Sequence, residues 1–154
     1  MDKTDRSILA LLQRDASLSI AAIAEQINLS PGPCWRRIRA LETAGYIRRR
    51  VAILDPSKIN VGTTVFVTLK TNRHDAEWFE AFAAAVSAMP EVVEFHRMSG
   101  DVDYLIRLAI PDIAAYDRVY KQLIRVGGLT DVSASFALEC IKSTTELPLN
   151  YIQA

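Results

Sequence analysis

Apolar and polar positions over the first fifty residues repeat with the period of an α-helix. Apolar residues three and four positions apart predict three short helices, over residues 3–13, 20–27 and 31–44. Ser19 and Ser30 stand at the expected N-caps of the second and third helices. Because only a few turn residues separate these two helices, the pattern predicts a helix-turn-helix.

The third predicted helix has two chemically different sides. Its inner side carries Cys34, Ile38 and Leu41, so we expect Cys34 to be a small buried residue of the core. Trp35 falls at the boundary between the two sides, and we expect it to pack within the three-helix unit. At about 100° per residue, the outer side carries small residues followed by arginines, namely Gly32, Pro33, Arg36, Arg39, Ala40 and Thr43.

Arginines are concentrated on this helix and directly after it, and Glu42 is the only acidic residue among them. Residues 46–54, which hold the last three arginines, are β-prone and predict a wing or a strand beside the DNA backbone. Guanidinium groups are suited to hydrogen bonds with guanine edges and phosphates, so these arginines predict a DNA-binding surface. The alternative interpretation is that they form an ordinary solvated helix face. The predicted DNA contacts are Ser30, Gly32, Pro33, Arg36, Arg37, Arg39, Arg48, Arg49 and Arg50.

Beyond residue 62 the pattern changes to alternating, β-branched segments separated by helical ones. Strand and helix patterns follow one another in the order βαββαβ, at residues 63–71, 76–89, 92–98, 102–110, 113–126 and 131–139. That order predicts a ferredoxin-like sheet with both helices on one face. The other face stays partly apolar, so we expect a second copy of the chain to cover it and the protein to be at least a homodimer.

These patterns predict an α+β chain with a DNA-binding domain over residues 1–54, a turn-rich linker over residues 55–62 and a second domain over residues 63–154. The 18 basic and 18 acidic residues give a net charge of zero, but they are unevenly distributed. Residues 1–54 hold nine basic and five acidic residues, and residues 55–154 hold nine basic and thirteen acidic ones. This asymmetry is expected when only the N-terminal domain meets double-stranded DNA.

The sequence argues against several other classes of protein. It has no signal peptide and no apolar run near the ~18 residues that a membrane span needs, so we expect a cytoplasmic, nucleoid-associated protein without a membrane partner. Cys34 and Cys140 form no disulfide or zinc pattern. His74 and His96 are isolated, and no nucleophile set or glycine-rich phosphate loop is present. We therefore expect neither an enzyme nor a metal or other cofactor.

Three segments carry a resemblance to a known family. They read DKTDRSIL at residues 2–9, LSPGPCWRRIRALE at residues 29–42 and SGDVDYL at residues 99–105. Together they resemble the Lrp/AsnC family of bacterial and archaeal feast/famine transcription regulators over nearly the whole chain. The resemblance implies an N-terminal DNA-binding domain and a C-terminal domain called RAM, for regulation of amino-acid metabolism. It also implies dimers that assemble into octamers or related oligomers, and an amino-acid effector held between RAM domains.

The same resemblance implies an effector site near a Gly-Asp turn, which Gly100 and Asp101 represent here. Backbone N–H groups of such a turn suit an α-carboxylate, and the Asp101 carboxylate suits an α-ammonium group. The structural alternative is that Gly100 only permits a positive φ in a hairpin that Asp101 completes. The implied effector residues are Met98, Ser99, Gly100, Asp101 and Tyr104, with Ser133 or Ser135 from a neighbouring strand or subunit.

Two functions fit these predictions. The first is a sequence-specific transcriptional regulator that responds to a small amino acid. The alternative is an architectural protein that wraps DNA with little sequence preference. The affinity for a specific site relative to random DNA, at fixed salt, separates the two.

Overall fold

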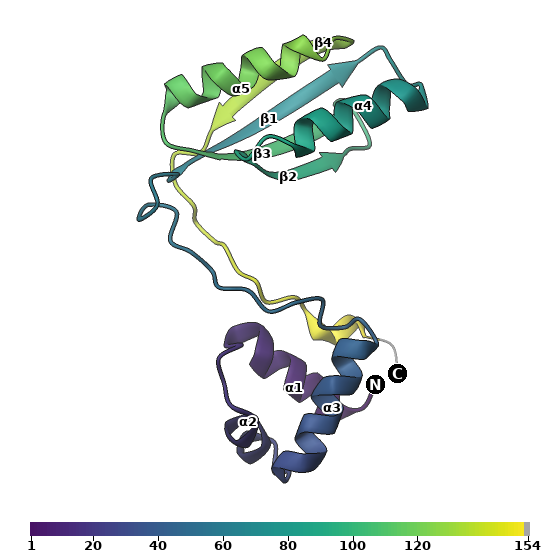
Figure 1. Ribbon diagram of the computed structural model, residues 1–154, viewed down its shortest axis with the longest axis vertical. Coiled ribbons are helices and arrows are strands. Elements are labelled where there is room, and N and C mark those ends of the chain that lie inside the picture. Colours follow the sequence, from purple (N-terminus) through teal and green to yellow (C-terminus); the bar gives the residue numbers. More distant parts are fainter. Residues whose placement is uncertain (153–154) are drawn as a thin grey trace. The chain divides into compact units, whose positions relative to one another are not determined.

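The structure is a computed structural model that describes residues 1–152 of the 154-residue chain, and these form two compact units (Figure 1). The first unit joins Met1–Ile53 to the chain from Ile141 onward, and the second unit is Leu54–Cys140. The sequence-based division placed every residue after 62 in the second domain. The structure differs, because the C-terminal segment returns to the helical unit and the expected linker belongs to the second unit.

Three helices form the first unit, as predicted. They are α1 (Lys3–Arg14), α2 (Ile20–Gln26) and α3 (Pro31–Thr43). The Ser19 hydroxyl accepts a hydrogen bond from the Ala22 N–H at 3.1 Å and so caps α2. Ser30 occupies the N-cap position of α3 without a side-chain capping bond. The apolar stripes meet in one core, whose buried members are Ile8, Leu9, Leu12, Ile23, Ala24, Cys34, Ile38 and Leu41.

Gly45 ends α3 in the left-handed conformation, with φ of 78°. Its N–H donates to the Glu42 carbonyl at 3.0 Å, and the Tyr46 N–H donates to the Leu41 carbonyl at 3.0 Å. These two bonds are those of a Schellman motif, which turns the chain away from the helix. The structure shows no strand over residues 46–54, where the sequence predicts a wing or strand. A strand needs a partner for its backbone groups, and the described residues offer this stretch none.

The C-terminal segment completes the first unit in a way that the sequence pattern did not reveal. The 3₁₀ turn η1 (Leu149–Tyr151) brings Leu149 and Ile152 against the helical core. Gln13 of α1 binds the segment twice, since its amide donates to the Leu147 carbonyl at 3.1 Å and accepts from the Leu147 N–H at 3.0 Å. A segment this short shows no periodicity, so its packing partner is not readable from sequence.

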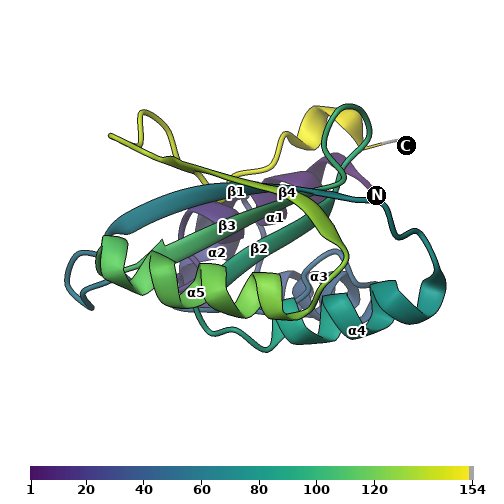
Figure 2. The same cartoon turned by 90° about the horizontal axis from the view of Figure 1, so that it is seen from above.

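The second unit is a four-stranded sheet with two helices in the predicted order βαββαβ. Its elements are β1 (Thr63–Thr71), α4 (Ala76–Ser87), β2 (Val92–Arg97), β3 (Tyr104–Ile110), α5 (Ile113–Arg125) and β4 (Leu129–Phe136). The strands lie in the order β2-β3-β1-β4, and every neighbouring pair is antiparallel. Both helices lie on the same side of the sheet (Figure 2).

The helix-covered face of the sheet holds the second core. Phe82 of α4 is fully buried as predicted, and Trp78 stacks on it with ring centroids 4.9 Å apart. The helical period puts Phe79 on the same stripe as Phe82, three residues on, but Phe79 is only half-buried, because Trp78 takes the inward position one residue earlier. The two central strands bury their alternate residues here, namely Val65, Val67, Leu69, Tyr104, Ile106, Leu108 and Ile110.

Neither helix covers the opposite face of the sheet, which we call the open face. It is partly apolar, as predicted, with Phe66 of β1 39% exposed and Leu105 of β3 half-buried opposite Thr68. It also carries charge, since Arg107 and Glu94 form an ion pair of 2.7 Å between β3 and β2. The open face therefore mixes apolar and charged residues on its central strands, since Arg107 lies directly opposite Phe66.

Candidate nucleic-acid interface and effector site

The outward side of α3 presents small residues and then arginines. Ser30 and Gly32 are exposed at its N-terminal end, and Pro33 is half-buried beside them. A Cβ atom at Gly32 would meet only the Arg36 guanidinium, at 3.8 Å, so the backbone here is open to a close approach. Arg36 and Arg39 follow on the same side and are exposed. This order suits a helix that enters the major groove of DNA by its N-terminal end.

Arg37 differs from these neighbours, because its charge is already used within the protein. Its Nη1 atom lies 2.6 Å from Asp2 Oδ2 and 2.8 Å from Asp5 Oδ1. Asp2 is the N-cap of α1, and the Asp5 N–H bond to its carboxylate, followed by the Arg37 bond, holds the pKa of Asp2 below its ordinary value. Bonds to Asp5 and then Asp2 raise the pKa of Arg37. Arg37 therefore ties α3 to α1, and its predicted DNA contact remains a prediction.

Glu42 links α3 to the segment that follows it. Its carboxylate accepts a hydrogen bond from Arg39 Nη1 at 3.0 Å and another from Arg50 Nη2 at 3.0 Å. The two guanidinium groups are therefore held on either side of one carboxylate, with about half of their combined charge neutralised. Both remain partly exposed, with side-chain accessibilities of 64% and 42%.

Three other arginines of the predicted interface remain open to an anionic partner. Arg36, Arg48 and Arg49 are exposed, and within residues 1–152 they form no ion pair. Each guanidinium keeps its charge and five N–H donors. Their grouping on and after one helix gives the unit a positive surface, which is the electrostatic footprint of a DNA-binding protein.

Cys34 and Trp35 are adjacent in sequence and opposite in environment. Cys34 is fully buried, as expected, and burial raises the pKa of its thiol. Trp35 is 50% exposed, so the expectation that it packs within the helical unit is wrong. The reason is its boundary position, since the inner side of α3 is already filled by Cys34, Ile38 and Leu41.

No metal site accompanies these residues. Cys34 and Cys140 are free, and Cys140 is exposed. Among residues 1–152, no group of three or more His, Cys, Asp or Glu side chains has the placement to hold a metal ion. Over the same residues, every helix is too short or too polar to cross a membrane.

A tight turn joins β2 to β3 and contains the residues implied for effector binding. Its Gly100 has φ of 115°, so the structural reason for a glycine holds in this chain. The Met98 N–H donates to the Asp103 carbonyl at 2.8 Å and closes the turn. Asp101 is 91% exposed and pairs with Lys70 of β1 at 3.0 Å. The four residues available to a ligand on this exposed turn are Met98, Ser99, Gly100 and Asp101.

Asp103 fixes this turn to the end of β1, and the sequence analysis missed it. Its N–H donates to the Leu69 carbonyl at 2.9 Å, and its Oδ2 accepts from the Thr71 N–H at 2.8 Å. The signal that could have pointed to Asp103 is an acidic residue two positions after the Gly-Asp pair. Its partner lies 32 residues away in sequence, so the contact itself was not predictable.

Tyr104 and Ser135 do not join the turn in this chain. The Tyr104 side chain is 3% exposed and packs among the core aromatic rings, 5.3 Å from Phe82 by centroid, so its ring has no surface for a ligand. Ser135 pairs with Phe66 of β1. Phe66 is four residues from Lys70, the residue that contacts the turn, and four residues of strand span about 13 Å. Ser133 lies nearer, opposite Thr68. The same-chain site therefore excludes the Tyr104 ring and Ser135.

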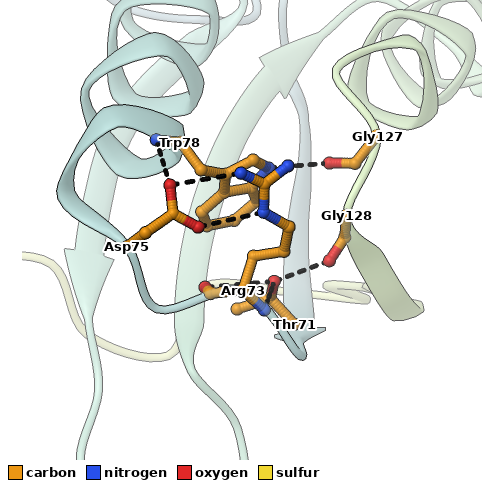
Figure 3. A network of polar contacts seen from close by, with 6 residues as sticks. All are labelled: Thr71, Arg73, Asp75, Trp78, Gly127 and Gly128. Atoms are coloured by element: carbon orange, nitrogen blue, oxygen red, sulfur yellow. Dashed lines mark hydrogen bonds and ion pairs between the residues drawn. The ribbon is translucent and has the colours of Figure 1, made fainter.

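A polar network at the same end of the sheet holds the neighbouring loops together (Figure 3). The buried Thr71 hydroxyl donates to the Gly128 carbonyl at 2.6 Å, and the Trp78 indole N–H donates to the Gly127 carbonyl at 3.0 Å. A Cβ atom at Gly128 would lie 2.6 Å from Trp78 Nε1, so this position requires glycine. Asp75 caps α4 through the Trp78 N–H at 2.9 Å. Because Asp103 also binds Thr71, the turn between β2 and β3 is joined to this network.

Both halves of the chain match models of known domains. Residues 64–147 match the Lrp/AsnC ligand binding domain, and residues 1–48 match a winged helix-turn-helix DNA-binding domain. The chain belongs to the Lrp/AsnC family. Members of this family are transcriptional regulators and not enzymes, and the helix-turn-helix followed by the antiparallel sheet is the family's fold.

Individual members of the family are similar along the whole chain. The DNA-binding transcriptional activator DecR of Escherichia coli (strain K12) is 50% identical over 150 residues, which cover 97% of this chain and 99% of DecR. An AsnC family transcriptional regulator from Agrobacterium tumefaciens has 56% identity and a TM-score of 0.96, with 99% and 100% of the two chains covered. Regulator NMB0573 of Neisseria meningitidis, in complex with L-Met, has 38% identity and a TM-score of 0.92, with 97% of each chain covered.

Proposed function

We propose that this member of the Lrp/AsnC family binds specific DNA sites and that a small amino acid modulates its binding. One observation carries the proposal: Arg36, Arg48 and Arg49 are exposed on and after α3 without ion pairs in the described chain, next to the open backbone at Gly32. Such a surface offers hydrogen-bond donors both to base edges in the groove and to the phosphates beside it. A regulator of this kind would act in the cytoplasm, on the nucleoid.

The DNA-contacting residues have distinct proposed roles. Ser30 and Gly32 would meet the backbone of the duplex at the N-terminus of α3, where the Gly32 N–H could bind phosphate, since Pro31 and Pro33 have no N–H. Arg36 and Arg39 would reach base edges, since they lie on the outward side of the helix. The residues assigned to phosphate contact are Arg48, Arg49 and Arg50, with Pro33 shaping the helix entry and Arg37 positioning the helix.

The proposed effector site is the exposed turn of Met98, Ser99, Gly100 and Asp101. The α-ammonium of an amino acid would pair with Asp101, in exchange for or beside Lys70, and the backbone N–H groups of the turn would bind the α-carboxylate. Lys70 is also placed to bind that carboxylate. The L-Met complex of the Neisseria meningitidis relative supports the class of ligand. A neighbouring subunit would supply further contacts, and Ser133 or Ser135 of that subunit is proposed among them.

The open face of the sheet is the proposed dimer surface. Its apolar residues Phe66 and Leu105 would be covered by the same face of a second copy. Dimers would then assemble into an octamer or a related oligomer, which would place effector turns between subunits. A ligand held between subunits alters DNA binding when it prefers one arrangement of the oligomer.

Competition between specific and random DNA tests the proposed function. Wild-type protein is used to select duplexes from a randomised pool, and its affinity for a selected duplex and a random duplex is then measured at one salt concentration. Specific regulators bind their site at least about 10³-fold more tightly than they bind random DNA. A ratio near one would instead support the architectural function.

A further inference from the structure

Trp35 is an exposed aromatic residue in the middle of the proposed DNA surface. It lies on α3 between the buried Cys34 and the exposed Arg36, and its side chain is 50% exposed. Trp78, the other tryptophan of the chain, is 6% exposed and belongs to the core of the sheet unit. The two tryptophans therefore differ in role, and Trp35 needs an explanation that core packing does not supply.

The protein itself gives Trp35 few interactions. Within the described residues, its ring has no aromatic partner and its Nε1–H has no hydrogen-bond acceptor, whereas Trp78 has both. A buried tryptophan N–H finds an acceptor, and an exposed ring of this size is common at contact surfaces. One exposed apolar residue alone identifies no partner. The residues around Trp35 on α3 indicate which kind of partner it contacts.

The helical neighbours of Trp35 indicate a nucleic acid and not a protein partner. On the helix surface, residues three and four positions away are adjacent, so Trp35 lies beside Pro31, Gly32, the buried Ile38 and Arg39. Arg36 follows directly, and Glu42, which holds Arg39 at 3.0 Å, lies two turns on along the same flank. A protein-binding patch needs contiguous apolar surface, which these small and charged neighbours do not provide.

We propose that Trp35 contacts the C5-methyl group of a thymine in the major groove and so determines part of the sequence specificity. This inference rests on the proposed function, because it assumes that α3 enters the groove. Trp35 is the fifth residue of α3, within the N-terminal part of the helix that reaches base edges. Arginine reads guanine through hydrogen bonds, whereas the thymine methyl is recognised by apolar contact. The indole thus reads what Arg36 and Arg39 do not.

The variants Trp35→Ala and Trp35→Phe test this role in the full-length protein. Each is titrated with a duplex selected by the wild type and with a random duplex of equal length. Trp35→Ala is expected to lose at least about fivefold affinity on the selected duplex and less than about twofold on the random one. Trp35→Phe keeps an apolar ring and should lose less on the selected duplex. The salt slope should stay unchanged, because no charge is removed.

Tyr151→Ala is the matched control, since Tyr151 is another exposed aromatic side chain of the helical unit, 79% exposed, outside α3. It should bind both duplexes as the wild type does. Thermal unfolding of all variants checks that the helical unit stays folded. An equal loss of affinity on both duplexes for Trp35→Ala, or no loss on either, would overturn the inference while leaving specific binding by the wild type intact.

Replacing single thymines of the selected duplex by deoxyuridine identifies the methyl group directly. At one position or more, the wild type should lose affinity, and Trp35→Ala should show no further loss at that position. The losses caused by Trp35→Ala and by the deoxyuridine are then not additive, which is the result that a double-mutant cycle gives for two groups in contact. A Trp35→Ala loss that remains the same at every deoxyuridine position would overturn the thymine contact. A wild type that does not distinguish selected from random DNA would overturn the proposed function, and this inference with it.

Fluorescence gives an independent readout. Acrylamide quenches exposed Trp35 and spares buried Trp78, so the quenching lost in Trp35→Phe reports Trp35 alone. Saturating selected duplex should shield Trp35 from acrylamide, whereas quenching that stays the same in the complex would contradict the contact.

Discussion

Arg37 of α3 and Asp2 at the cap of α1 form an ion pair with Nη1 and Oδ2 2.6 Å apart. Asp2 also caps α1 by accepting the Asp5 N–H at 2.8 Å. These contacts link the start of α1 to α3, although α1 carries no proposed DNA contact. Among the arginines of α3, Arg37 is paired with α1, whereas Arg36 and Arg39 face outward.

Replacing Arg37 by alanine should lower stability and leave sequence preference intact. Its pairs with Asp2 and Asp5 are largely screened by solvent, so we expect a loss of about 0.5–1 kcal/mol in the free energy of unfolding, measured with urea. Arg36→Ala is the control and should change the unfolding free energy by less than ~0.5 kcal/mol. An Arg37→Ala variant of native stability that no longer binds DNA would place Arg37 on the DNA.

Glu42→Gln should raise affinity for random DNA more than for a selected duplex. The substitution removes the carboxylate that holds Arg39 and Arg50, so the Arg50 guanidinium becomes free for a phosphate. We expect the salt slope to steepen by about one phosphate contact and the specificity ratio to fall. Glu25→Gln, an exposed acid on α2, controls for the loss of one negative charge. If both variants behave alike, Glu42 acts only through net charge.

Asp101→Ala should abolish the response to the effector and leave DNA binding without effector close to wild type. Asp101 is 91% exposed and its pair with Lys70 contributes little to stability, so the fold should persist. A thermal-shift screen of the twenty amino acids first identifies the ligand. Typical couplings of ~1–3 kcal/mol then shift the DNA titration by about fivefold or more. A full response in Asp101→Ala would show that the turn is only a structural hairpin.

Much of this fold was predictable because its signals are local. Ser30, Pro31 and Gly45 mark the ends of α3, and alternation of apolar residues marks β1 and β3. Periodicity of that kind reports which side of an element is buried, and both cores follow it. Alternation along residues 104–110 also puts Tyr104 on the same face as Ile106, Leu108 and Ile110. The effector role implied for it by family resemblance conflicted with that pattern, and the structure agrees with the pattern.

The parts that were not predictable depend on partners far apart in sequence. Arg37 and Asp2 are 35 residues apart, and no pattern within α3 distinguishes Arg37 from Arg36. Trp35 stands at the edge of the helix face, where a small rotation decides between burial and exposure. The same holds for the C-terminal segment, whose Leu149 packs on a core formed by residues at the other end of the chain.

Phe66→Glu should dissociate the proposed dimer. Phe66 is 39% exposed at the centre of the open face, and a carboxylate there would lose its hydration in a face-to-face dimer. We expect a smaller particle by sedimentation velocity at micromolar concentration. The control is Ile113→Glu, since Ile113 is 71% exposed at the start of α5, away from the open face. Equal sedimentation of Phe66→Glu and wild type would move the interface elsewhere.

The measurement that tests the central claim most directly is a fluorescence-anisotropy titration of Arg36→Ala and Arg49→Ala with selected and random duplexes at fixed salt. Arg36→Ala should cost about 1–3 kcal/mol on the selected duplex and much less on the random one, because it removes a base contact. Arg49→Ala should weaken both duplexes alike and reduce the salt slope by about one, because it removes a phosphate contact. Wild-type affinity in both folded variants would contradict DNA binding by this surface.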